Sequence, residues 1–74
     1  MRKVVIGQIY KHFKGALVKV TDIALDSETL ERMIIYCHLD NGQSWVRPEK
    51  MFLEKVTKDG KSFARFSISK TKVI

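Results

Sequence analysis

Residues 32–47, with the sequence RMIIYCHLDNGQSWVR, decide the fold because they hold a strand, a tight turn and a returning strand. The first part alternates between two faces, with Ile34 and Tyr36 on one face and Ile35 on the other. Asn41-Gly42 is the strongest short signal for a hairpin, because both residue types accept a positive φ. The stretch QSWVR then returns alongside the first strand. We therefore predict an antiparallel hairpin in the middle of the chain.

The segment before this hairpin, residues 16–25, reads as one long strand with a break in its pattern. Val18 and Val20 share one face by simple alternation, whereas Ile23 falls on the other face. A change of phase inside a strand is typical of a β-bulge or a sharp bend. We place that bend near Thr21-Asp22, where it lets one strand serve two sides of a small fold.

The remaining segments complete an all-β order. We predict a strand over residues 7–13, a polar turn over 26–31, a short helical turn over Pro48–Met51, and strands over 52–56 and 62–68. Proline cannot donate to a sheet ladder and suits the first helical position. This order is that of a small SH3-like barrel or roll of five to six strands with one short helical turn. Closure of the roll would bury the sheet edges.

The length and composition fit one small globular domain over residues 1–74. No stretch approaches the ~18 consecutive apolar residues of a membrane span, and the apolar run after the start is too short for a signal peptide. We therefore expect a cytoplasmic protein that does not associate with membranes. Cys37 is the single cysteine, which excludes an internal disulfide and a thiolate zinc cluster, and we expect it to be a small buried apolar residue.

The net charge of +6 is distributed unevenly along the chain. Residues 1–21 carry a net +5, residues 22–54 a net −4 and residues 55–74 a net +5. If the two basic ends meet on one face, that face would attract phosphate groups or an acidic protein. The alternative is that the charge serves solubility alone.

The sequence offers few candidates for catalysis. Ser27, Cys37 and the two histidines, His12 and His38, fall into no spacing that implies an activated nucleophile, a metal site or a phosphate loop. Cys37 and His38 are adjacent on a strand and so point to opposite faces. We predict no catalytic residue, no metal and no cofactor, and a small enzyme is the least favoured function.

Aromatic and basic residues are interleaved in two places, which favours a binding site. Strand alternation groups Tyr10 with His12, and Trp45 with Arg47. If Val46 is a core residue, Trp45 and Arg47 point outward beside each other. Such a surface suits single-stranded nucleic acid or a peptide. The predicted ligand-binding residues are Tyr10, His12, Lys14, Ser27, Glu28, Thr29, Trp45 and Arg47.

Several alternatives stay open at this point. Tyr10, Phe13 and Trp45 are also plausible core residues of a small barrel, and Phe13 is best read that way. Residues 26–29 also fit a solvated turn whose side chains bond their own backbone. A different function is that of a structural or assembly module, a monomer or weak homodimer that pairs through an exposed strand edge.

Four blocks of sequence closely resemble DUF family 1653, a bacterial domain of unknown function. They are YKHFKG (10–15), IALDSET (23–29), WVRPEKMF (45–52) and DGKSFARF (59–66). The resemblance implies a small SH3-type barrel, found alone or fused to other domains, with no established activity. The chain departs from the family pattern at Asp26, where a histidine is usual, and at Ala64, where a proline is usual. A family role for that histidine would therefore not carry over to Asp26.

Overall fold

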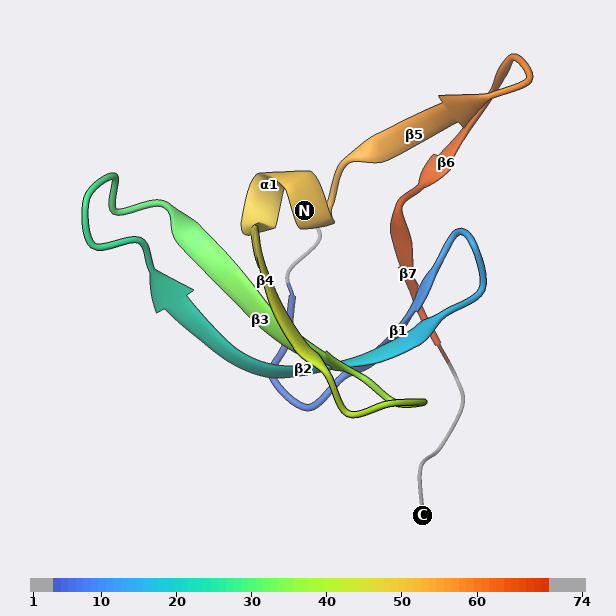
Figure 1. Ribbon diagram of the computed structural model, residues 1–74. Helices are drawn as coiled ribbons and strands as arrows, with labels where there is room; N and C mark the ends of the chain where they lie inside the picture. The colour runs from blue at the N-terminus through green and yellow to red at the C-terminus, as the bar shows by residue number, and fades with distance from the viewer. Residues whose placement is uncertain (1–3, 70–74) are drawn as a thin grey trace.

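The predicted hairpin of residues 32–47 forms the middle of the structure, a computed structural model that describes residues 4–69 (Figure 1). Strand β3 (Arg32–His38) pairs antiparallel with β4 (Ser44–Pro48), with Tyr36 opposite Trp45. In the connecting turn, Asn41 Oδ1 accepts the N–H of Gln43 at 2.9 Å. Gly42 has a φ of +71°, a conformation that glycine adopts without a steric penalty.

Three further strands extend this hairpin into a five-stranded sheet with the order β4-β3-β2-β1-β7. They are β1 (Ile9–His12), β2 (Leu17–Leu25) and β7 (Phe66–Ile68). Two more strands, β5 (Lys55–Lys58) and β6 (Lys61–Ala64), form a separate hairpin that projects from the body of the molecule. We call residues 55–64 the arm. The all-β prediction is confirmed, with seven strands in residues 4–69 rather than five to six.

The bulge predicted at Thr21-Asp22 is present. The register of β2 against β3 shifts between Val20, which lies opposite Tyr36, and Asp22, which lies opposite Ile35. The extra residue returns Ile23 to the inner face, where it packs against the core that Val20 also joins. β2 therefore bends strongly along its length and curls the sheet (Figure 1).

Aromatic rings fill the inside of the curled sheet. The rings of Phe52 and Phe66 are stacked with centroids 4.1 Å apart and planes 3° apart. Tyr10 and Tyr36 pack edge-on against Phe52 at 5.1 and 5.6 Å. The buried residues of the described chain are Val4, Ile9, Tyr10, Val18, Val20, Ile34, Tyr36, Phe52 and Phe66.

The helical turn α1 (Glu49–Phe52) begins one residue later than predicted, because Pro48 is the last residue of β4 and caps the helix with an extended ψ of 139°. Within this turn, Phe52 is buried and Met51 is exposed. Within residues 4–69, no helix is long and apolar enough to cross a membrane.

The prediction of a closed barrel is wrong. β4 and β7 are the two edges of the sheet, and no ladder pairs them in the described chain. Side chains join these edges instead: the guanidinium carbon of Arg47 lies 5.7 Å from the ring centroid of Phe66. We call the space between the β4 and β7 edges the seam.

The final predicted strand, residues 62–68, is also divided in two. The chain bends at Arg65 between β6 and β7. The backbone N–H of Arg65 donates to the Glu54 carbonyl at 3.0 Å, and its Nη2 pairs with Glu54 Oε1 at 3.1 Å. These two contacts fix the bend and separate the arm from the sheet.

Candidate ligand-binding groove

A groove with a volume of about 340 Å³ lies over the seam. We call it the seam groove. Its walls come from β1, β3, β4, β7 and the loop that follows β1. The lining residues are His12, Lys14, Ala16, Tyr36, His38, Trp45, Arg47 and Phe66. None of these eight side chains is acidic, so the groove has no fixed negative charge of its own.

The register of the central hairpin turns Trp45 and Arg47 toward this groove. Trp45 lies opposite the buried Tyr36, and Arg47 lies opposite the buried Ile34, so both share the inner face of the sheet. Val46 faces the other way and is 59% exposed. Val46 is therefore not a core residue, and the condition for an outward-facing Trp45 is not met. Trp45 and Arg47 do share a face as predicted, but it is the concave one.

Trp45 forms an exposed rim of the groove. Its side chain is 54% exposed, and its ring lies edge-on to the ring of His38 with centroids 6.2 Å apart. The floor consists of the buried rings of Tyr36 and Phe66, which contact each other at 5.6 Å. An exposed indole above an aromatic floor offers a face on which a planar group can stack.

Arg47 supplies an unpaired cation to the same space. Its Nη1 is buried and has no hydrogen-bond partner among residues 4–69. None of the ion pairs found in that part of the chain includes Arg47. A buried donor without an acceptor costs roughly 1–3 kcal/mol, and more when it is charged. An anion bound in the groove would supply the acceptor that this donor lacks.

His12 lies between Arg47 and Lys14 and responds to their charge. Its Nδ1 accepts the backbone N–H of Lys14 at 3.1 Å, so the neutral ring carries its proton on Nε2. Burial lowers the pKa of His12 below 6.5, and the nearby charges of Arg47, Arg65, Lys14 and His38 lower it further. A site that resists protonation of a histidine has a positive potential, which attracts anions.

The two basic segments of the sequence are neighbours at this side of the fold. β1 pairs with β7, with Lys11 opposite Ser67, and the β5–β6 arm precedes β7. Lys11, Lys14 and the lysines of the arm are therefore on neighbouring segments. The terminal cations Arg2, Lys3, Lys70 and Lys72 lie outside the described residues.

Tyr10 does not line the groove, so its predicted role is wrong. It shares a face with His12 as expected, but its side chain is only 2% exposed and packs against Phe52. Strand alternation predicts which face of the sheet a side chain is on, but it does not predict how deeply that side chain is buried. Tyr10 is in the interior of β1, whereas His12 is at its end and reaches the groove.

The loop residues Ser27, Glu28 and Thr29 do not line the groove either. They precede the start of β3, whereas the groove lies at its other end, a seven-residue strand or roughly 20 Å away (Figure 1). Asp26 Oδ1 accepts the backbone N–H groups of Glu28 at 2.9 Å and Thr29 at 3.1 Å. These bonds lower the pKa of Asp26, and the loop is a self-bonded turn.

His38 is a groove residue that the sequence prediction omitted. It follows Tyr36 at the strand period of two, and its N–H bonds the Gln43 carbonyl at 2.9 Å across the hairpin. The hairpin signal at Asn41-Gly42 could have placed it beside Trp45.

Cys37, on the opposite face, is half-buried rather than fully buried. Within residues 4–69, no group of three or more metal-ligating side chains is close enough to hold a metal ion.

Comparison with known proteins identifies the family. The family described as "Protein of unknown function (DUF1653)" matches residues 8–68, which is most of the chain. The chain belongs to the DUF1653 family. A crystal structure of a DUF1653 protein from Bordetella bronchiseptica is similar to this chain, with a TM-score of 0.78 and 20% sequence identity. The match covers 95% of this chain and 94% of that one.

The similarity to the Bordetella DUF1653 structure concerns the fold alone at this level of identity. A search of curated proteins found no significant match. The resemblance inferred from four sequence blocks is thus confirmed at the level of the family.

Proposed function

We propose that this protein is a non-catalytic binding module that recognises single-stranded nucleic acid in the seam groove. One observation carries the proposal: Arg47, whose Nη1 is buried without a hydrogen-bond partner, lines the same groove as the exposed ring of Trp45. A nucleotide presents a planar base and an anionic phosphate side by side. The indole would stack the base, while Arg47 and Lys14 would bind the phosphate.

The composition of the groove favours a nucleotide over a neutral peptide segment. Its ionisable side chains are His12, Lys14, His38 and Arg47, with Tyr36 on the floor, so every fixed charge is positive. A peptide backbone is neutral and would leave these cations unpaired. A peptide that ends in the groove with a carboxylate is the remaining competitor, because it supplies an anion without needing the stacking surface.

The test uses the fluorescence of Trp45, the only tryptophan of the chain. Single-stranded RNA and DNA oligonucleotides should quench it, because a stacked base contacts the indole directly. Affinity should fall with salt, with a slope of log K against log salt of roughly −0.7 for each phosphate bound. Absence of any response at low salt rejects the nucleic-acid function, and a response only to peptides with a free carboxylate favours the competitor.

Val46→Ala is the matched control for this titration. Val46 is the neighbour of Trp45 on the outer face of β4 and leaves the indole in place. Its variant should bind oligonucleotides as the original protein does.

Sedimentation of the free protein at several concentrations tests the assembly function, because a concentration-dependent dimer would place the exposed β4 edge in a protein interface instead.

His12 should make this binding depend on pH. Burial and, after it, nearby cations hold its pKa below 6.5 in the free groove, and a bound phosphate would offset the cations and raise the pKa. The complex therefore takes up a proton, so affinity rises as pH falls from about 7.5 to about 5.5, by less than about tenfold per unit. His12→Gln should flatten this profile, measured by fluorescence titration at constant salt.

His38 is the control for the pH profile, because it is the other histidine that lines the groove. If the dependence of affinity on pH is kept in His12→Gln and lost in His38→Gln, the role given to His12 is wrong. The free protein loses stability as pH falls through this window, since its unfolded chain takes up the His12 proton first. An unfolding curve at the lowest pH therefore accompanies each titration.

A further inference from the structure

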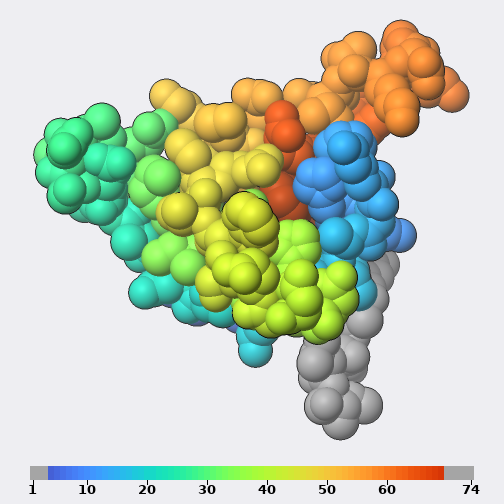
Figure 2. Space-filling model, in the orientation of Figure 1, coloured from blue at the N-terminus to red at the C-terminus, as the bar shows by residue number. Residues whose placement is uncertain are grey.

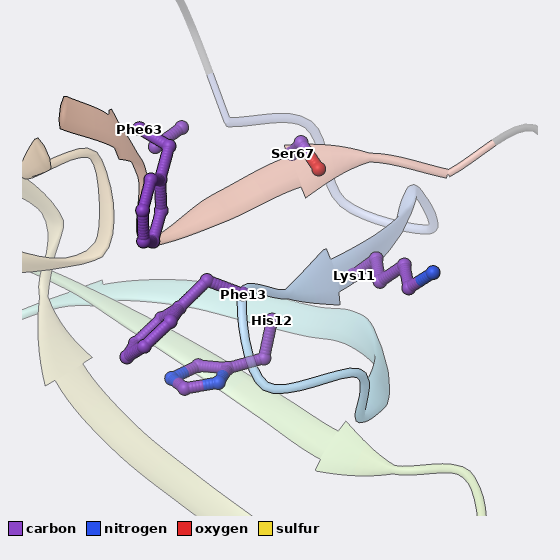
Figure 3. Close-up of a pocket in the computed structure, with 6 residues that line it drawn as sticks. Lys11, His12, Phe13, Phe63 and Ser67 are labelled. Carbon is purple, nitrogen blue, oxygen red and sulfur yellow. The ribbon is translucent and has the colours of Figure 1, made fainter. Parts of the chain in front are cut away.

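A second hollow lies directly beside the seam groove and shares a residue with it. It has a volume of about 440 Å³ and lies between the end of β1 and the arm. We call it the arm hollow. In Figure 3 the rings of His12, Phe13 and Phe63 point toward one another, whereas Lys11 points away from them. Its lining residues are Lys11, His12, Phe13, Phe63, Ala64 and Ser67, so His12 borders both hollows.

Aromatic rings continue from one hollow into the other. Trp45 lies next to His38 in the seam groove at 6.2 Å. On the other side, the ring of Phe13 lies 4.5 Å from that of His12 and 5.6 Å from that of Phe63. Phe13, which was expected in the core, is instead half-buried on this surface. The buried rings of Tyr36 and Phe66 connect His38 to His12, so planar side chains run from β4 to the arm.

Lysines flank the arm end of this row. Lys58 and Lys61 lie directly opposite each other at the tip of the arm. Like charges in that position destabilise a hairpin. Neither has an acidic partner among the ion pairs of residues 4–69. A bound anion would relieve this repulsion.

The same two lysines are on the aromatic face of the arm. Residues two apart on a strand share a face, so Lys61 lies on the face of Phe63, which contacts Phe13 across the arm hollow. Lys55 lies opposite Ala64 and is on the other face. At the near end of the row, Lys14 Nζ lies 5.8 Å from the Phe13 ring centroid. Cations thus accompany the rings beside Phe13 and at the tip of the arm.

We infer that the seam groove and the arm hollow form one continuous track for a single strand, with the arm as a second attachment point for its phosphates. This inference rests on the proposed function and extends it to the size of the ligand. A ligand confined to the seam groove needs one or two nucleotides. A strand that also reaches the arm needs about four or more, the lower end of what small nucleic-acid barrels bind.

The space-filling view supports an arm free to contact a ligand. In Figure 2 the arm, coloured orange, stands clear of the body at the upper right. Its contact with the body through Phe63 is to Phe13, and the sheet itself includes neither β5 nor β6. A structural explanation would be that Phe63 only fixes the arm to β1. That explanation gives no role to the opposed lysines, and the experiment separates the two.

The experiment measures binding of oligo-dT from about two to about ten nucleotides by Trp45 fluorescence. The affinity of the unmodified protein should rise with length to about four to six nucleotides and then level. The variant Lys58→Gln/Lys61→Gln should bind the longest strand about tenfold more weakly, with the salt slope reduced by roughly 1.4. Its affinity for the dinucleotide should stay unchanged.

Lys55→Gln is the matched control for Lys61→Gln, with the same charge change on the opposite face of the same arm. Equal losses in these two variants would mean that only net charge matters and would overturn the track. Equal affinity for the shortest and longest strands would overturn it too, while leaving the seam groove as a binding site. If no strand of any length binds, the proposed function itself fails.

Discussion

Phe52→Ala is expected to destabilise the protein by about 3–5 kcal/mol. The ring of Phe52 is fully buried, stacks on Phe66 at 4.1 Å and contacts two tyrosines edge-on. A domain of 74 residues has a free energy of unfolding of roughly 4–11 kcal/mol. The variant should therefore lose a large share of this stability, and a protein at the lower end of the range would reach its unfolding midpoint in water. Urea denaturation followed by circular dichroism measures the difference.

Met51→Ala is the matched control, because Met51 is the neighbour of Phe52 in α1 but is exposed. Its effect should stay within about 0.5 kcal/mol, as is usual for surface positions. If the free energy of unfolding of Phe52→Ala is less than about 1 kcal/mol below that of the original protein, our account of the core is wrong. The seam would then have to be held by something other than its stacked rings.

The parts of this fold that the sequence predicts are those encoded by neighbouring residues. Asn41-Gly42 sets the central hairpin because its turn needs a positive φ, which Gly42 adopts. The phase change around Thr21 predicts the bulge, because a period of two cannot otherwise bring Val20 and Ile23 to one core. Both signals are local, and both are confirmed.

Features that depend on distant partners could not be predicted in the same way. The sequence pattern of β4 is apolar on both faces, so only its register against Tyr36 shows that Trp45 and not Val46 faces inward. The division of the last strand depends on Arg65 and Glu54, which meet only after the chain folds back. Closure of the barrel likewise depends on how closely β7 approaches β4.

The site was predicted in part for the same reason. Trp45, Arg47, His12 and Lys14 were placed in one groove from interleaved aromatic and basic residues, and the structure brings all four together. How deeply Tyr10 is buried, and how far residues 27–29 lie from the groove, both depend on the assembled sheet. No pattern within either segment reports them.

Arg47→Gln should weaken oligonucleotide binding by roughly 10- to 150-fold, the equivalent of the about 1.5–3 kcal/mol of a hydrogen bond to a charged group. Arg47→Lys should recover only part of this loss, because an ammonium lacks the planar fork that binds a phosphate with two bonds. Trp45 fluorescence titration at fixed salt and pH measures both variants. Arg32→Gln provides the comparison, since it removes one positive charge from a surface ion pair with Glu49 that does not line the groove.

Stability provides the decisive second measurement for Arg47. In the free protein its Nη1 is buried without a partner, so Arg47→Gln removes an unfavourable feature of the free state. It also removes the contact of Arg47 with the Phe66 ring, worth about 0.5–1 kcal/mol, so the two effects offset each other. The stability of the variant should stay within about 1 kcal/mol of the original protein while its binding weakens. If Arg47→Gln loses both stability and affinity, Arg47 is a structural residue that covers Phe66. If Arg47→Gln and Arg32→Gln lose the same affinity for oligonucleotides, Arg47 contributes only its net charge.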